Sequence, residues 1–109
     1  MSEEVSICYK FNKDKLINKS TCVVSTGYGA GGSYITLEKG KSIYNIEIEN
    51  RYDKKTDSYE EGDITLNEML VTSYYRDLFY NKIADKSFVN DDSLSCFLTK
   101  NKKIDICYK

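Results

Sequence analysis

The segment from Gly27 to Gly32 carries a glycine motif that could bind a phosphate. It reads Gly-Tyr-Gly-Ala-Gly-Gly and matches the spacing of the dinucleotide-binding loop, in which glycines open a helix whose N-terminus meets the pyrophosphate. Here a β-prone stretch, Ser33 to Leu37, follows the motif, where a nucleotide site requires a helix. We therefore expect a flexible connection between two strands, and we keep Tyr28 as a candidate contact for a ligand bound by this loop.

The chain lacks the side chains on which most acid–base and nucleophilic catalysis depends. It contains no histidine, which is the commonest general base and the usual partner of a serine or cysteine nucleophile. The adjacent carboxylates Glu60–Glu61 and Asp91–Asp92 lie in polar segments, whereas a glycosidase needs two carboxyl groups that face each other across a cleft. We therefore expect that the protein is not an enzyme.

Four cysteines could act as thiolate ligands or form disulfides. No two of them form a C-x-x-C motif, and without histidine a zinc site would need all four thiolates, so we expect no metal and no cofactor. In a cytoplasmic protein the four would be buried free thiols. If they are oxidised, Cys8 and Cys107 are the first candidate pair, because they lie in near-identical segments that we expect in one sheet. The remaining two cysteines are Cys22 and Cys96.

The most distinctive stretch is acidic and runs from Glu47 to Asp63. It holds seven acidic residues against three basic ones. Carboxylates on such a segment complement a basic cleft and steer association, and tyrosines supply contact area with a hydrogen-bonding tip. The alternative is an ordinary solvated loop; calcium binding is disfavoured because the D-x-D-x-D-G spacing is absent. The residues expected to contact a partner are Tyr52, Asp53, Asp57, Tyr59, Glu60, Glu61 and Asp63.

Composition argues against nucleic acid and membranes as partners. The formal charge is −1, from 17 acidic and 16 basic residues, and nucleic-acid binding usually requires a basic surface. The chain has no run of about 18 apolar residues of the kind that spans a bilayer. The first residues, Met-Ser-Glu-Glu, lack the layout of a signal peptide. We therefore expect a cytoplasmic protein, or a periplasmic one if a signal peptide has been removed.

Alternation of apolar and polar residues predicts the strands. They cover the ranges 5–11, 21–26, 33–38, 42–49, 94–99 and 103–108. Tight turns at Lys39–Lys41 and Lys100–Lys102 predict two hairpins. The polar stretches 12–20 and 50–63 are expected to be loops, although a short helical turn is the alternative for the first.

One helix is expected, from Thr65 to about Lys86. Thr65 and Glu68 have the spacing of a capping box, and apolar residues recur on one face from Leu66 onwards. The predicted fold is α+β in a single domain, residues 1–109. It consists of an antiparallel sheet of about six strands in the order ββββ-α-ββ, with the helix packed across it.

A small, tyrosine-rich domain with an acidic loop and no catalytic equipment resembles the immunity proteins of contact-dependent growth inhibition. The resemblance is one of general character, carried by the stretch from Glu47 to Asp63 and by the missing histidine. It implies a small cytoplasmic protein that blocks the active site of a cognate toxin, such as a nuclease with a basic cleft. Phage inhibitors of bacterial defence enzymes are similar, as are type VI secretion immunity proteins, some of which are periplasmic. A ligand-binding module built on Gly27–Gly32 is the remaining alternative.

Overall fold

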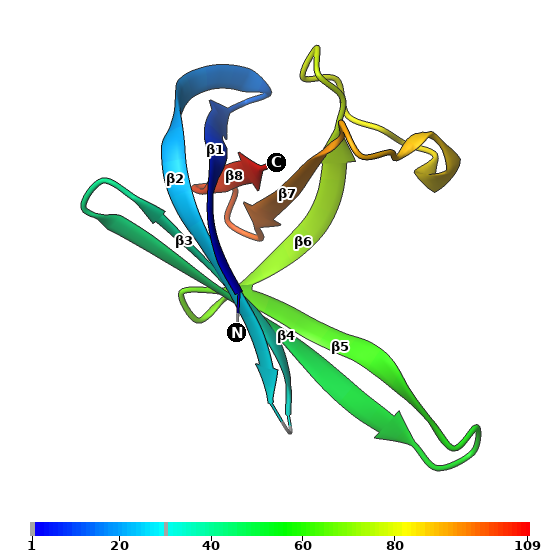
Figure 1. Ribbon diagram of the computed structural model, residues 1–109. Helices are drawn as coiled ribbons and strands as arrows, with labels where there is room; N and C mark the ends of the chain where they lie inside the picture. The colour runs from blue at the N-terminus through cyan, green and yellow to red at the C-terminus, as the bar shows by residue number, and fades with distance from the viewer. Residues whose placement is uncertain (1, 30) are drawn as a thin grey trace.

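The protein is an antiparallel β-barrel whose strands follow one another around the wall in chain order (Figure 1). The computed structural model describes residues 2–29 and 31–109, and over these residues eight strands close the barrel. Each strand pairs with the next, and β1 pairs with β8. The strands are β1 (Ser2–Asn12), β2 (Lys15–Gly29), β3 (Gly32–Lys39), β4 (Ser42–Asp53), β5 (Ser58–Leu66), β6 (Met69–Arg76), β7 (Leu94–Thr99) and β8 (Asp105–Tyr108).

Two-residue turns produce much of this up-and-down order. Lys13 and Asp14 link β1 to β2 with backbone φ of 51° and 66°, and Asn67 and Glu68 link β5 to β6 with φ of 48° and 71°. Gly40, with φ of 59°, opens the turn between β3 and β4. Positive φ at these positions matches the twist of a tight hairpin, so successive strands lie side by side.

The predicted helix over residues 65–86 is wrong, and the α+β class is wrong with it. Thr65 lies in β5, and Asn67 and Glu68 have the positive φ values of a hairpin turn, which a right-handed helix excludes. β6 follows with β-branched and aromatic residues, which favour a pleated strand. The spacing from Thr65 to Glu68 therefore imitates a capping box without forming one. The helical content of the described residues is a single 3-10 turn, Lys86–Phe88.

The remaining predictions are correct where a strand has one buried face and wrong where most of its side chains are exposed. The two predicted hairpins are confirmed as β3–β4 and β7–β8, and the two ends of the chain share a sheet, since Cys8 pairs with Tyr108. The predicted loops are wrong: residues 12–20 hold a turn and the start of β2, and residues 50–63 hold the end of β4, a turn and part of β5. Most side chains in these two stretches are exposed, so their strands carry no buried face that alternation could reveal.

Two clusters of buried side chains lie on opposite faces of β1, β7 and β8. The larger fills the barrel interior and includes Leu37, Ile46 and Ile106, none of which has exposed surface. The smaller includes Tyr9 and Phe11 and is packed beneath Tyr80 of the connection after β6. Burying an aliphatic or aromatic side chain contributes about 1.5–3 kcal/mol, so these two clusters stabilise the barrel.

All four cysteines form disulfides, contrary to the expectation of free thiols. Cys8 is joined to Cys22 and Cys96 to Cys107, with Cα–Cα distances of 5.8 and 4.0 Å. The predicted pair of Cys8 with Cys107 is therefore wrong, although the two lie on neighbouring strands. Cys107 is opposite Tyr9 in the ladder, one position away from Cys8, and side chains one position apart point to opposite faces of a sheet.

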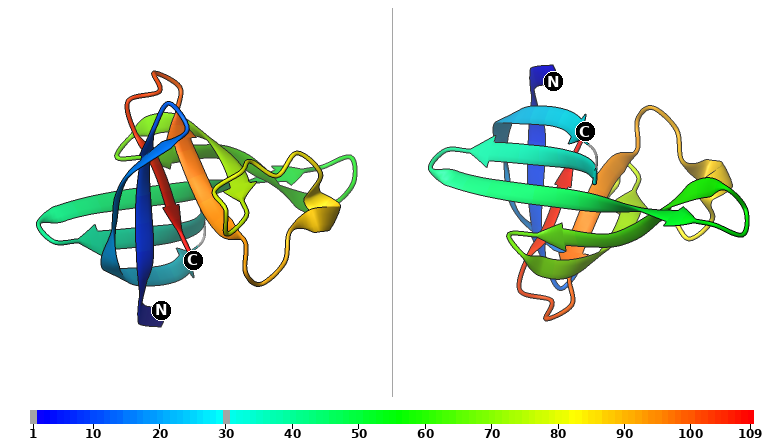
Figure 2. Two further views of the ribbon diagram at one scale, coloured as in Figure 1. Left: turned by 90° about the horizontal axis from the view of Figure 1, so that it is seen from above. Right: turned by 90° about the horizontal axis from the view of Figure 1, so that it is seen from below.

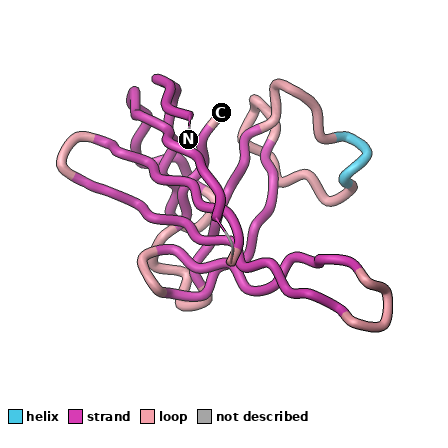
Figure 3. Tube along the Cα trace, turned by 60° about the horizontal axis from the view of Figure 1, so that its bottom comes forward, coloured by secondary structure: helices cyan, strands magenta, loops and turns pink. Residues whose placement is uncertain are grey.

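Two segments project from the barrel. One is the distal part of the β4–β5 hairpin, and the other is the connection between β6 and β7, residues 77–93 (Figure 2). Figure 3 shows them as separate extensions: the hairpin ends in a turn, and the connection carries the 3-10 turn Lys86–Phe88 at its outer end. Most residues of both segments are exposed and therefore accessible to a partner.

Candidate functional site

The acidic stretch forms a two-stranded arm, which we define as residues 49–63. The β4–β5 ladder passes from Ile48↔Ile64 to Asn50↔Glu61, so that Gly62 and Asp63 stand opposite Glu49 alone. Such a bulge bends a strand pair and increases its twist. Beyond it the arm continues away from the barrel (Figure 1). The carboxylates expected on a mobile loop therefore lie on a hydrogen-bonded hairpin.

Arg51 links the two strands at the bulge. Its Nε donates to Glu49 Oε1 and its Nη2 to Asp63 Oδ2, both at 3.2 Å. The guanidinium lies over Gly62, where an added Cβ would be 2.8 Å from Arg51 Nε. The hydrogen bond to Glu49 and the charges of Glu49 and Asp63 raise the pKa of Arg51. Because these side chains are about half exposed, each ion pair contributes about 1 kcal/mol or less and mainly orients the arm.

The tip of the arm is ordered by its own polar groups. The Tyr52 hydroxyl donates a hydrogen bond to Asp57 Oδ1, which raises the pKa of Tyr52. Asp53 Oδ1 accepts the Lys55 amide at 2.9 Å and closes the first part of the turn. Asp57 has φ of 50°, a conformation that Asp tolerates better than most residues. The tip thus presents a tyrosine ring and carboxylates in a defined arrangement.

The arm brings together the predicted contact residues that the structure describes. Asp57, Glu60 and Asp63 are exposed, Tyr52 is half exposed, and Asp53 is partly buried. Asp63 differs from the rest because Arg51 already neutralises it at the base of the arm. The backbones of Tyr59 and Glu61 pair with Tyr52 and Asn50, but their side chains lie outside the described part of the molecule.

The glycine segment meets the base of this arm. An open hollow of about 590 Å³ lies between them, lined by Gly29 and Tyr34 on one side and by Glu47 and Asp63 on the other. Gly32 is required here, since its φ is 148° and an added Cβ would be 2.0 Å from the carbonyl oxygen of Ile48. Tyr28 is 88% exposed at the end of β2 and lines a neighbouring hollow of about 360 Å³. Ala30, within the predicted loop, lies outside the described residues.

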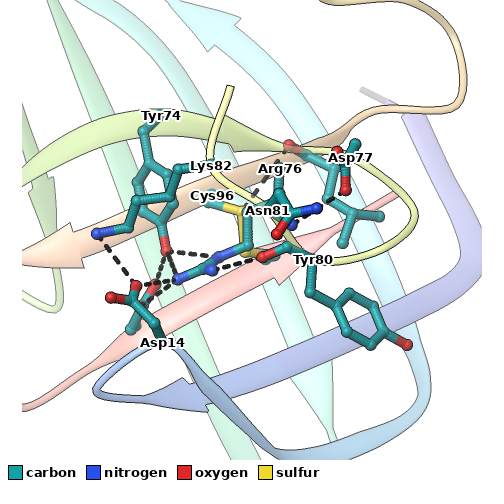
Figure 4. A network of polar contacts seen from close by, with 11 residues as sticks. Asp14, Tyr74, Arg76, Asp77, Tyr80, Asn81, Lys82 and Cys96 are labelled. Carbon is teal, nitrogen blue, oxygen red and sulfur yellow. Dashed lines mark hydrogen bonds and ion pairs between the residues drawn. A yellow bond between two sulfur atoms is a disulfide. The ribbon is translucent and has the colours of Figure 1, made fainter. Parts of the chain in front are cut away.

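A buried charged network that the sequence does not reveal surrounds Arg76 (Figure 4). Arg76 is 1% exposed and donates to Asp14 Oδ1 at 3.0 Å, to Asp105 Oδ2 at 3.2 Å and to the Tyr80 carbonyl at 2.8 Å. It also donates to the Tyr74 hydroxyl at 2.9 Å, and that hydroxyl in turn donates to Asp105. Burial, followed by the bond to Asp105, raises the pKa of Tyr74. The network fixes the start of residues 77–93 against the β1–β2 turn.

Asp14 is the exposed end of this network. Its carboxylate lies 3.1 Å from Lys82 Nζ and 3.0 Å from Arg76 Nη2. These two hydrogen bonds, with Lys82 the larger contributor, lower the pKa of Asp14. The two positive and two negative charges of the network are all paired with one another. The network therefore anchors structure and leaves no charge free for a ligand. Arg76 falls within the range of the predicted helix, residues 65–86, and that prediction gave no reason to expect its burial.

The connection that Arg76 anchors exposes large apolar side chains. Phe79 is 84% exposed, Phe88 is 71% exposed and Leu78 is 49% exposed. Together with Asp77 and Asn90 they line a hollow of about 260 Å³. Exposed apolar groups that cluster in this way are typical of contact surfaces. Leu78 and Phe79 both fall within the range of the predicted helix, residues 65–86.

Comparison with known proteins finds no match to a protein-family model, to a curated protein or to a solved structure. Within the described residues, no helix has the length and apolar character needed to cross a membrane.

Proposed function

We propose that the protein is a stoichiometric protein inhibitor, of the kind represented by bacterial immunity proteins, that places its acidic arm in the basic cleft of a partner enzyme. The observation that carries this proposal is the arm itself: a hairpin rich in carboxylates that leaves a closed barrel at a bulge. From residue 47 to residue 63 the acidic residues outnumber the basic ones by seven to three. A projecting shape with a concentrated charge fits a concave, positively charged active site.

The order within the arm supports a binding role. Tyr52 is held by Asp57, and Arg51 connects both strands at the base. A contact surface that is already ordered loses less conformational entropy on binding than a flexible loop does. Tyr52 adds a half-exposed aromatic ring, and rings of this kind often dominate the energy of an interface.

The disulfides bear on where the inhibitor acts. Bonds between Cys8 and Cys22 and between Cys96 and Cys107 persist in oxidising compartments and are rare in the cytoplasm. We therefore favour the periplasmic alternative over the cytoplasmic one, with a toxin or other enzyme of that compartment as the partner. A phage-encoded inhibitor of a cytoplasmic defence enzyme is the alternative, and it requires reduced cysteines.

Calorimetry with the enzyme encoded beside this protein's gene tests the proposal. Reversing two exposed carboxylates of the arm, Asp57→Lys with Glu60→Lys, should weaken binding by at least about tenfold, which corresponds to about 1.4 kcal/mol. The loss should shrink as salt concentration rises, because salt screens exposed charges. The matched control reverses exposed carboxylates on the barrel, Glu3→Lys with Glu38→Lys. Equal affinity and equal salt dependence for the arm variant and the control would refute the arm contact.

A second candidate function is the binding of a small ligand in the hollow between Gly29 and Glu47. It is favoured by the volume of about 590 Å³, which is within the range of small-molecule sites. Gly29→Val tests it, because a Cβ at Gly29 meets nothing within 4 Å and the barrel should still fold. Thermal-shift measurements over a panel of cationic small molecules should show stabilisation of the wild type that the variant lacks. A panel that stabilises neither protein, or both equally, would count against this function.

A further inference from the structure

The junction between β5 and β6 is the shortest in the barrel wall. Over the described residues the two strands pair only at Thr65↔Leu70 and Leu66↔Met69. On its other side, β6 pairs with β7 at every position from Val71 to Arg76. Figure 1 shows β5 leaving toward the arm while β6 turns the opposite way. Residues 72–75 of β6 therefore have a neighbouring strand on one side only.

Two hydrogen bonds show which backbone groups face the open side of β6. The Leu70 carbonyl accepts the Lys100 amide at 2.9 Å on the β7 side, and the Tyr75 carbonyl accepts the Ile83 amide at 2.9 Å on the opposite side. Backbone groups of successive strand residues point to alternate sides, so Ser73 faces the same side as Tyr75. Over the described residues, the β5–β6 ladder ends at Leu70 and gives Ser73 no partner on that side. A free amide and carbonyl of this kind can pair with an added strand.

A cavity lies directly behind this open edge. It has a volume of about 170 Å³ and is lined by Ile48 and Ile64 at the base of the arm, by Ser73 and Tyr75 of β6, and by Phe97 of the adjacent strand β7. A side chain that entered from an added strand would meet aliphatic and aromatic groups. Strand addition joins backbone hydrogen bonds, which give affinity, with a side-chain pocket, which gives specificity. Both features are present at this junction.

We propose that the open edge of β6, residues 72–75, binds an extended segment of a partner protein by β-strand addition. The segment carries an aliphatic or aromatic residue that enters the cavity. The bridge between Arg76 and Lys82 closes the far end of the edge, so the segment is short. This site is distinct from the arm tip and does not depend on the function proposed for it.

Amide hydrogen exchange measured by NMR tests the free edge and its occupant. In the free protein the Ser73 amide should exchange at least about tenfold faster than the amides of Thr72 and Tyr74, which face β7. The probe is a short synthetic peptide of alternating valine and phenylalanine with a lysine at each end. At saturating peptide the Ser73 amide should become protected by at least about tenfold, while amides of the arm tip keep their rates.

Two controls test whether the peptide binds by strand addition. A peptide with the same side chains but N-methylated on alternate backbone nitrogens cannot form the ladder and should give no protection. Ser73→Pro removes the edge amide, and proline is tolerated on a free strand edge, so the variant should fold and fail to bind the peptide. If that variant does not fold, the methylated peptide still separates strand addition from hydrophobic contact. Slow exchange of Ser73 in the free monomer, equal protection by both peptides, or protection that follows self-association of the protein would overturn the proposal.

Discussion

Arg76 Nη2 lies 3.2 Å from Asp105 Oδ2, and both side chains are almost fully buried. The guanidinium is also stacked on the ring of Phe11, with Cζ 4.0 Å from the ring centroid. A buried ion pair contributes little net stability compared with an apolar pair, but the loss of one member leaves an uncompensated charge. The pair therefore makes the anchor of residues 77–93 sensitive to single substitutions.

Arg76→Ala should lower the free energy of unfolding by about 3–5 kcal/mol, because Asp105 would remain buried without an opposite charge. Urea denaturation followed by circular dichroism measures the change. The control is Arg51→Ala on the arm, which removes two half-exposed ion pairs and should cost about 1 kcal/mol or less. If the two substitutions have the same small effect, Arg76 does not occupy a buried charged site.

Alkaline pH should destabilise the protein through Tyr74. Burial and the hydrogen bond to Asp105 raise the pKa of Tyr74 above its ordinary value of 10.0, so the folded state holds the phenolic proton more tightly than the unfolded state. The resulting stability is complete below pH 10 and is lost as the pH rises through the folded pKa. The melting temperature of the wild type should therefore fall above pH 10.

Tyr74→Phe is the matched variant for this pH dependence. It is expected to be less stable at neutral pH, because Arg76 and Asp105 lose a hydrogen-bonding partner, but to have a shallower decline at alkaline pH. Some decline should remain, since burial also raises the pKa of Tyr108. Parallel curves of melting temperature against pH for the wild type and the variant would show that Tyr74 is not the titrating group.

The disulfides predict that the native protein has no reactive thiol. Labelling with a thiol reagent under denaturing conditions, without reductant, should modify none of the four cysteines. Peptide mapping should recover Cys8 linked to Cys22 and Cys96 linked to Cys107. Reduction should lower stability by about 3 kcal/mol for each loop of this size, according to the chain-entropy account. Labelling of all four cysteines, or a Cys8–Cys107 peptide, would contradict the pairing and the periplasmic proposal that depends on it.

Local sequence signals were sufficient where one face of a strand is buried. The alternation around Leu37 and Ile46 predicted the β3–β4 hairpin because those side chains fill the barrel while their neighbours face outward. The same signal failed in the arm, whose strands expose most of their side chains. The arm's strand structure depends on backbone pairing and on Arg51 across the bulge, neither of which leaves a periodic pattern in the sequence.

Residues 65–76 show how apolar spacing can indicate the wrong element. Leu66, Met69 and Leu70 have the i, i+3, i+4 spacing of one helical face, but Leu66 ends β5 and the other two begin β6, on either side of a two-residue turn. The burial of Arg76 could not be predicted from local sequence either, because its partners Asp14 and Asp105 are distant in the chain and meet only when the barrel closes. The predicted disulfide pairing is wrong for a related reason. The sequence predicted that Cys8 and Cys107 lie in one sheet, but not the register that places Cys107 opposite Tyr9.

Glu68→Gly tests the β5–β6 turn through the sign of its effect. Glu68 has φ of 71°, which costs about 1–2 kcal/mol for a residue with a Cβ and little for glycine. The substitution should therefore stabilise the protein in urea denaturation, whereas glycine inside a helix would destabilise it by about 1 kcal/mol. Asn67→Ala is the companion variant and should destabilise, because Asn67 Oδ1 accepts the Asn45 amide at 2.9 Å. Loss of stability in Glu68→Gly would favour a helix at this position over the hairpin.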